Sequence, residues 1–209
     1  MYTYGGTVFR STQFEYDTVG RLTQTEDFDA TGAKIGASEY IYSEDRCERI
    51  DRGEAGIVTG RVLEEYDGKH LIRISSFDNR NTPRRIKTLK YSDNRLVKSE
   101  SRYYGANGDL YELSITDYDS KGRVSSSYGL KADGSPLGDG KYRYEYDERG
   151  RRAKVWTYNE FDGSDTPSGV SIYEYTDDEH GNWIEQRERR LWRNDSYESK
   201  RIVTRKLTY

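Results

Sequence analysis

Few residues of the types that build disulfide frameworks and metal centres occur in this sequence. Its 209 residues include one cysteine, two histidines and three prolines. Cys47 alone cannot form an intramolecular disulfide, and no combination of cysteine and histidine has the spacing of a zinc site. No apolar run approaches the roughly 18 to 20 residues that span a bilayer. We therefore expect no disulfide, no cofactor, no metal site and no membrane span.

Catalytic motifs are equally scarce. His70 and His180 lie in or beside expected turns, where a polar residue is ordinary, and Cys47 fits a strand thiol better than a nucleophile. The sequence has neither a Gly-x-Ser-x-Gly motif nor a phosphate-binding loop. The acidic run from Asp177 to Glu179 could bind calcium weakly, but it lacks the alternating oxygen ligands of a dedicated loop. The sequence thus predicts no catalytic residue and no enzyme activity.

The charged residues are numerous but balanced, with 34 basic and 37 acidic residues and a net charge of −3. Because the two signs are interspersed, there is no basic field that would release counterions from a phosphate backbone. The clusters Arg84–Arg85 and Arg187–Arg190 are best explained as solvated strand faces, and Glu188 dilutes the second. Nucleic acid is therefore not an expected partner.

Tyrosine dominates the aromatic residues, with 20 tyrosines against 5 phenylalanines in a chain that is only 33% hydrophobic. An aromatic content of 13% argues against disorder, because disordered chains lack the rings that folding buries. Tyrosine can pack its ring while its hydroxyl reaches water at the edge of a thin layer. We expect a shallow β layer with tyrosine and leucine rows on one face and charged residues on the other.

An internal repeat organises the chain. Its unit reads aromatic-x-Tyr, then Asp, a short polar stretch, Gly and Arg, and it is clearest at residues 14–21 and 144–151. Residues 118–123 and 173–181 give two more copies, and shorter forms occur at residues 40–46, 66–69 and 89–95. The anchor tyrosines recur 24 to 34 residues apart, at Tyr16, Tyr42, Tyr66, Tyr91, Tyr118, Tyr146, Tyr175 and Tyr209.

The Asp-x-x-Gly part of the unit predicts the reversal of a β-hairpin. An Asp at the first position of a type I turn accepts hydrogen bonds from backbone amides, and a Gly at the fourth position can take the left-handed conformation that forms a bulge. Asp67-Gly68 and Asp93-Asn94 fit tighter two-residue turns. The expected structural turn residues are Asp17, Gly20, Asp67, Gly68, Asp119, Gly122, Asp147, Gly150, Asp178 and Gly181.

A second set of turn signals lies between successive anchors, at residues 29–32, 52–56, 78–83, 105–108, 132–140, 162–169 and 193–196. All three prolines, Pro83, Pro136 and Pro167, fall in these return turns, as proline should. About 15 strand segments remain, several of which alternate visibly. The expected fold is all-β: an antiparallel up-and-down meander of tandem β-hairpins that forms a curved open sheet or partial shell, in a single domain over residues 1–209.

The unit Tyr-x-Tyr-Asp-x-x-Gly-Arg resembles the signature of the YD-repeat (Rhs-type repeat) family, and the match recurs over nearly the whole chain. The resemblance implies one hairpin per repeat, spiralling into a sheet or hollow shell. It also implies a bacterial, toxin-related protein that is secreted or held in the cell envelope, its signal peptide removed or absent from this sequence. The chain lacks the C-terminal core, rich in Asp-Pro, Gly-Leu and Asn-x-Tyr elements, with which toxin-carrying members close the shell.

Two functions remain open. The first is a non-catalytic repeat scaffold or binding module for a glycan or a protein, and the second is a fragment or relative of a toxin-encapsulating YD/Rhs shell. Trp156, Tyr158, Trp183 and Trp192 are the candidate ligand-binding residues, since rings on a sheet can stack on sugars, although a core position accounts for them more simply. Exposed terminal strands also predict edge-strand self-association.

Overall fold

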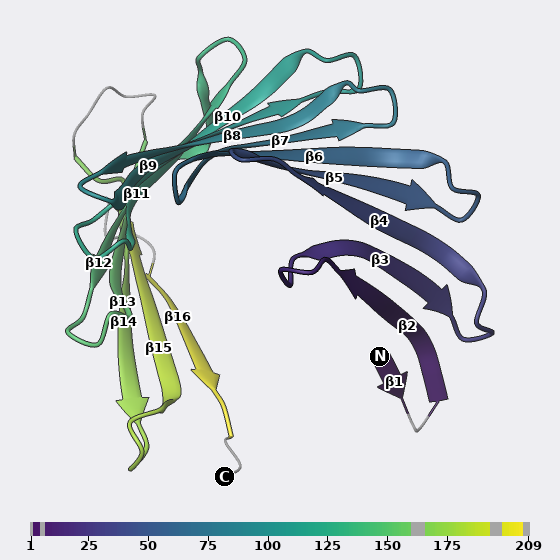
Figure 1. The fold of residues 1–209 in the computed structure, drawn as a ribbon. Helices are drawn as coiled ribbons and strands as arrows, with labels where there is room; N and C mark the ends of the chain where they lie inside the picture. The colour runs from purple at the N-terminus through teal and green to yellow at the C-terminus, as the bar shows by residue number, and fades with distance from the viewer. Residues whose placement is uncertain (1, 5–6, 160–165, 193–197, 207–209) are drawn as a thin grey trace. The chain divides into compact units, whose positions relative to one another are not determined.

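The computed structural model describes all of the chain except residues 1, 5–6, 160–165, 193–197 and 207–209. The described part contains no helix, and its sixteen strands form one open antiparallel sheet in chain order (Figure 1). The strands are β1 Tyr2–Tyr4, β2 Thr7–Tyr16, β3 Leu22–Asp29, β4 Lys34–Tyr42, β5 Arg46–Gly53, β6 Val58–Asp67, β7 His70–Asp78, β8 Pro83–Ser92, β9 Arg95–Tyr104, β10 Leu110–Tyr118, β11 Val124–Lys131, β12 Pro136–Tyr146, β13 Arg152–Tyr158, β14 Gly169–Asp177, β15 Trp183–Trp192 and β16 Glu198–Thr204. The predicted all-β up-and-down meander is confirmed.

The Asp-x-x-Gly reversals have the backbone that the sequence predicts. At Asp17 the amide of Gly20 donates to the Asp17 carbonyl (3.0 Å), and the Asp17 amide donates to the Arg21 carbonyl (2.9 Å). Glycine takes the left-handed conformation at the same place in each copy, with φ of +83° at Gly20, +76° at Gly122, +78° at Gly150 and +79° at Gly181. Each of these four hairpins therefore closes with a type I turn and a bulge.

The return turns use the same geometry at the other ends of the hairpins. At Asp29 the amide of Gly32 donates to the Asp29 carbonyl (3.1 Å), and the Asp29 amide donates to the Ala33 carbonyl (2.9 Å). Gly32 has a φ of +84°. One type of backbone turn thus reverses the chain at both ends.

The tight turn is confirmed at one place and shifted at the other. Asp93 and Asn94 have φ of +52° and +62°, so both central residues are left-handed. Asp67 is instead the last residue of β6 and pairs with His70, which makes Gly68 and Lys69 the centre of the turn. The prediction of Asp67 as a central turn residue is wrong, because Gly68, with a φ of +56°, fills the first central position, where glycine costs least.

Two of the three prolines lie at strand starts and not in turns. Pro83 and Pro136 are the first residues of β8 and β12, where proline is tolerated, while Pro167 precedes β14 as predicted. The return turn expected over residues 132–140 is shorter, since the Gly134 amide already donates to the Lys131 carbonyl (2.9 Å). The return turn expected at residues 193–196 lies outside the described residues, as does much of the one at residues 162–169.

The chain divides into two compact units. Unit 1 comprises residues 1–90 and 100–111, and unit 2 comprises residues 91–99 and 112–209. Strands β1 to β7 belong to unit 1 and β11 to β16 to unit 2, whereas β8, β9 and β10 contribute residues to both.

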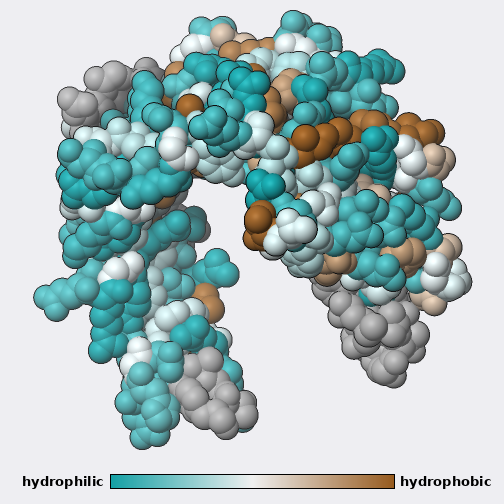
Figure 2. All heavy atoms as spheres, viewed as in Figure 1, coloured by the Kyte–Doolittle hydropathy of each residue, from teal (hydrophilic) through white to brown (hydrophobic). Residues whose placement is uncertain are grey.

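Each unit is a thin layer. Among the side chains that the structure describes, Ile115 is the only buried hydrophobic one, at 6% exposed. Hydrophilic residues cover most of the visible surface in Figure 2, and most strand residues are half-buried. With so little buried apolar area, the layer depends on contacts between neighbouring strands.

Three residues of the repeat form a clasp between consecutive hairpins. Asp147 accepts hydrogen bonds from the amide of Arg151 (2.8 Å) and from its Nε (2.7 Å). The guanidinium carbon of Arg151 lies 4.4 Å from the ring centroid of Tyr175, the anchor of the next hairpin. The Tyr175 hydroxyl donates in turn to the carbonyl of Arg152 (3.1 Å). We call this arrangement the Asp–Arg–Tyr clasp.

The clasp recurs at two other copies of the repeat. The distance from guanidinium carbon to ring centroid is 4.3 Å for Arg123 and Tyr146 and 4.8 Å for Arg21 and Tyr42. The tyrosine hydroxyls donate to the carbonyls of Val124 (2.8 Å) and Leu22 (2.9 Å). The signature arginine of one repeat therefore covers the signature tyrosine of the next.

Candidate functional site

One face of β12 to β15, within unit 2, carries two parallel rows of cross-strand neighbours. Residues directly opposite on antiparallel strands share a face of the sheet. Read from β12 to β15, the rows are Tyr142–Thr157–Gly169–Trp192 and Tyr144–Val155–Ser171–Arg190. Both rows have large side chains on the outer strands and short ones on β13 and β14.

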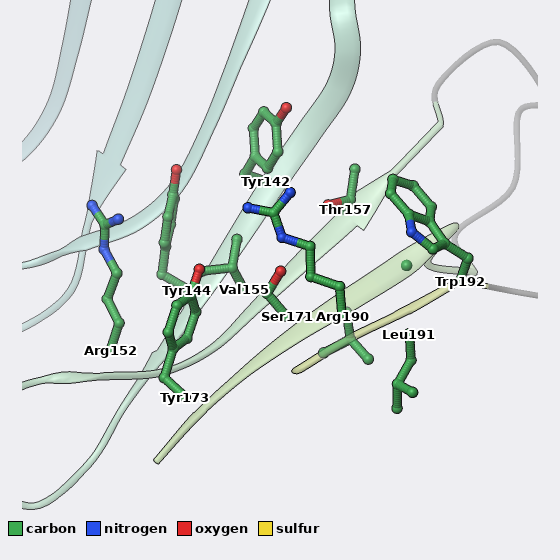
Figure 3. A pocket seen from close by; sticks show the side chains of 12 residues that line it. Tyr142, Tyr144, Arg152, Val155, Thr157, Ser171, Tyr173, Arg190, Leu191 and Trp192 are labelled. Carbon is green, nitrogen blue, oxygen red and sulfur yellow. The ribbon is translucent and has the colours of Figure 1, made fainter. Parts of the chain in front are cut away.

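The short side chains leave a hollow between the large ones (Figure 3). Its volume is about 290 Å³, and Arg152, Val170, Tyr173 and Leu191 complete the lining. Figure 3 shows the guanidinium of Arg190 in the middle, next to Tyr142, with Arg152 and Trp192 at opposite ends. We call this site the Tyr142 hollow. Its volume lies near the lower end of the range for small-ligand pockets, so it suits a ring-sized group.

The absence of a side chain at Gly169 leaves the space that the indole of Trp192 occupies. A Cβ on Gly169 would lie 3.1 Å from Cε3 of Trp192 and 3.2 Å from the carbonyl oxygen of Leu191. Any side chain there would therefore push the indole away from β14. Trp192 remains 41% exposed, so part of its ring is accessible from solvent.

A buried carboxylate holds two of the lining side chains. Glu188, at 9% exposed, accepts hydrogen bonds from Nε of Arg190 (2.6 Å) and from the hydroxyl of Tyr173 (3.3 Å). The hydrogen bond to Glu188 raises the pKa of Arg190, and burial, together with the Glu188 carboxylate, raises the pKa of Tyr173. At neutral pH the hollow thus presents a charged Arg190 and a protonated Tyr173.

Arg152 supplies a second positive charge. It begins β13, its guanidinium carbon lies 5.1 Å from the ring centroid of Tyr144, and it forms no ion pair with a described residue. The clasp fixes this end of β13, because the Arg152 carbonyl accepts the Tyr175 hydroxyl (3.1 Å). Among the residues that the structure describes, no carboxylate lines the hollow.

The four rings predicted to bind a ligand do not form one row. Trp192 lines the hollow, whereas Trp156 and Tyr158 lie on the other face, where Nε1 of Trp156 donates to Glu145 (2.8 Å). Trp183 begins β15 at the end far from Trp192, and its ring contacts Tyr175 at 6.4 Å between centroids. The expected separation into a tyrosine face and a charged face is wrong here, because rings and charges occur on both faces.

Five lining residues are not among those that the sequence predicts for a site: Tyr142, Tyr144, Tyr173, Arg152 and Arg190. The alternation Tyr142-Arg143-Tyr144 is a signal that both tyrosines share a face. The short residues Gly169 and Ser171 alternate in the same way on β14. These residues become neighbours only through the register in which β12 to β15 pair, and the sequence alone does not reveal that register.

The two histidines fall in different units of the chain. His70 belongs to unit 1 and His180 to unit 2. Burial, with Glu64 nearby, raises the pKa of the Cys47 thiol. No group of three or more His, Cys, Asp or Glu residues in the described part could hold a metal ion. No helix among those residues is long and apolar enough to cross a membrane.

The acidic run beside His180 is occupied by partners from the protein. Asp177 accepts hydrogen bonds from Nη1 of Arg149 (2.6 Å) and Nη1 of Arg151 (2.5 Å). Asp178 accepts from the amides of His180 (3.0 Å) and Asn182 (2.8 Å), as the first residue of a turn. These contacts explain the run as part of the turn edge.

The fold defines the chain as an antiparallel meander of β-hairpins. No protein-family model matches the chain, and no curated protein matches it. A porin-like protein from Bacteroides uniformis ATCC 8492 is similar in structure at 13% identity, over 90% of this chain and 85% of that one, with a TM-score of 0.44. A protein with unknown function from Bacteroides fragilis NCTC 9343 is similar at 10% identity, over 64% of this chain and 92% of that one, with a TM-score of 0.30. At these values neither likeness carries an argument.

Proposed function

We propose that this chain is a non-catalytic repeat module that binds a ligand through the Tyr142 hollow. The observation that carries the proposal is the pairing of large residues with short ones: Tyr142 faces Thr157, and Trp192 faces Gly169. Cross-strand pairs stabilise a sheet best when large side chains cover one another. Rings left partly uncovered around a hollow are instead typical of a binding surface.

The proposal includes the YD-type relationship and a place in the bacterial cell envelope or secretome. The three Asp–Arg–Tyr clasps support the relationship, since they give the Asp, the Arg and the anchor Tyr of the repeat signature a structural role. A glycan or an exposed side chain of a protein fits the hollow, because rings, hydroxyl groups and guanidinium groups surround it.

Matched tryptophan substitutions test this function. The chain and its Trp192→Ala and Trp156→Ala variants would be applied to arrays of bacterial surface glycans and envelope proteins. We expect Trp192→Ala to lose binding and Trp156→Ala, on the opposite face, to keep it. Absence of any bound glycan or protein for the unsubstituted chain at high concentration would contradict the proposal, as would equal losses in two folded variants.

A second candidate is a section of a larger YD-type shell, and an open sheet edge favours it. Strand β1 pairs with residues 7–10 of β2, so residues 11–16 lack a strand partner on that side among the described strands. Tyr16 is 61% exposed, and no described arginine stacks on its ring. Further repeats and a variable toxin domain in the encoding gene would support this candidate, whereas an export signal with a stop after Tyr209 would contradict it.

A further inference from the structure

The charges around the Tyr142 hollow narrow the class of ligand, and this step rests on the binding function proposed above. We propose that the hollow takes an acidic sugar unit, a pyranose that bears a carboxylate, within a longer saccharide. We base it on the two guanidinium groups, the partly exposed rings and the position of the hollow on the face of the sheet.

The two guanidinium groups provide positive charge that is complementary to a carboxylate on the ligand. Arg152 and Arg190 approach from β13 and β15, and the described part of the chain places no carboxylate in the lining with them. Glu188 engages Nε of Arg190, so the opposite edge of that guanidinium points into the hollow beside Tyr142 (Figure 3). Among the described residues, the Glu188 carboxylate offsets the charge of Arg190. The charge of Arg152 therefore remains as one excess positive charge at the hollow. Planar guanidinium groups bind carboxylates through paired hydrogen bonds.

The rings supply the complement to a sugar. A pyranose has an apolar C–H face and a rim of hydroxyl groups, and an aromatic side chain offers an apolar face of similar size. Trp192 presents 41% of its surface, and the hydroxyl of Tyr173 keeps its proton. Stacking on a ring together with hydrogen bonds to the rim would fix one sugar unit.

The place of the hollow argues against other occupants. It lies in the middle of four paired strands, so a peptide cannot join as an added strand, which requires a free edge. Single-stranded nucleic acid is bound along extended basic grooves, whereas two arginines line this hollow in a chain of net charge −3. The partial exposure of Trp192 fits one unit of a chain whose remainder stays in solvent.

Calorimetric titration with paired saccharides tests the inference. The probes are uronate-containing and sialate-containing oligosaccharides, each compared with its methyl ester, which removes the charge and keeps the ring. We expect the acidic form of at least one pair to bind at least about 10-fold more tightly than its ester, with an affinity that falls as sodium chloride is raised.

The arginine variant and its control make the test specific. Arg152→Gln should weaken binding of the acidic form by about 10-fold or more and weaken binding of the ester by a smaller factor. Arg143→Gln is the matched control, because Arg143 pairs with Trp156 on the opposite face, and it should bind as the unsubstituted chain does. Arg190 is not substituted, because its removal would leave the buried Glu188 carboxylate without its ion-pair partner.

The outcomes separate this inference from the function on which it rests. Equal binding of acid and ester that is lost in Trp192→Ala would keep the binding function and overturn the acidic ligand. Tighter binding of adenosine monophosphate than of any acidic saccharide would overturn it as well. If no saccharide binds, and no array component binds in a Trp192-dependent way, both proposals fail together.

Discussion

The turns at the two ends of the hairpins have the same backbone geometry, but they differ in the residue that follows the turn glycine. The turns at Asp147 and Asp29 have the same pair of backbone hydrogen bonds and a left-handed glycine. The next residue is Arg151 in the first and Ala33 in the second. Arg151 reaches the ring of the following hairpin, whereas the methyl side chain of Ala33 only leads into β4, which begins at Lys34. The signature arginine thus binds the Asp of its own turn and also reaches the neighbouring hairpin.

This difference also bears on the binding site. The clasp at Asp147 ends where β13 begins, and Arg152 at that point lines the Tyr142 hollow. The hollow itself depends on the alignment of four strands in rows. A link between consecutive hairpins at one end of the strands helps to hold those rows in register.

Valine in place of the turn glycine tests whether the backbone turn is the same at both ends. Gly150→Val and Gly32→Val should each destabilise the fold by about 1–3 kcal/mol, because a β-branched residue is strained at positive φ. Space is not limiting, since a Cβ meets nothing within 4 Å at Gly32 and only Arg123 Nη1 at 4.0 Å at Gly150. Guanidinium chloride unfolding measures both. A loss at one end alone would break the equivalence.

Removing an arginine from each end tests the difference between them. Arg151→Ala should cost about 1–2 kcal/mol, because it removes two ion pairs and the cover over Tyr175. Arg84→Ala removes an exposed ion pair with Asp78 at a return turn and should cost less than about 0.5 kcal/mol. Thermal unfolding would compare the variants. Equal costs would mean that the clasp adds nothing to an ordinary surface pair.

Deleting the anchor hydroxyl tests the last contact of the clasp. Tyr146→Phe should cost about 0.5–1.5 kcal/mol, because the hydroxyl donates to the half-buried strand start at the Val124 carbonyl (2.8 Å). Tyr111→Phe is the control, since Tyr111 is 54% exposed, and it should leave stability nearly unchanged. Urea unfolding followed by circular dichroism distinguishes them, and an unaffected Tyr146→Phe would remove the hydroxyl from the account.

Acid and salt should produce the smallest effects. The Arg123 guanidinium lowers the pKa of Asp119, and the Thr31 hydroxyl lowers that of Asp29. Since each folded pKa lies below the unfolded value of about 3.9, the contributed stability is present above that value and lost as the pH falls through the folded pKa. Urea midpoints should therefore drop below about pH 4, and less so in Asp119→Asn and Asp29→Asn.

In the same urea unfolding measurement, salt should affect the Asp119 turn more than the Asp29 turn. Sodium chloride at about 1 M shortens the screening length to about 3 Å, so it should weaken the Asp119–Arg123 ion pair. Asp29 is bound by a hydroxyl and by backbone amides, which salt screens less. An equal response of Asp119→Asn and Asp29→Asn to salt would contradict this distinction.

Local chemistry made the turns predictable. Asp and Gly at fixed spacing specify a reversal without help from the rest of the chain, and Gly20, Gly122, Gly150 and Gly181 all lie at reversals. The shift at Asp67 arose because two readings of Asp67-Gly68-Lys69 were compatible with the sequence, and glycine prefers the first central position. The sequence places Pro83 and Pro136 in turns and the structure at strand starts, because the exact start of a strand depends on its pairing partner.

The binding site was less predictable because it depends on non-local register. Trp156 and Trp192 are equally prominent in the sequence, but their faces are decided by the pairing of β12 through β15. The hollow arises from Gly169 and Ser171, which carry no signal of binding by themselves. Arg152 becomes a lining residue only because the clasp and the bulge position the start of β13.

A double-mutant cycle between Arg123 and Tyr146 tests the clasp most directly. The free energies of unfolding would be measured for Arg123→Ala, Tyr146→Leu, the double variant and the unsubstituted chain. The 4.3 Å stacking distance predicts a coupling free energy of about 0.5–1.5 kcal/mol between the two side chains. Additive costs, with a coupling below about 0.3 kcal/mol, would show that neighbouring hairpins are not joined in this way.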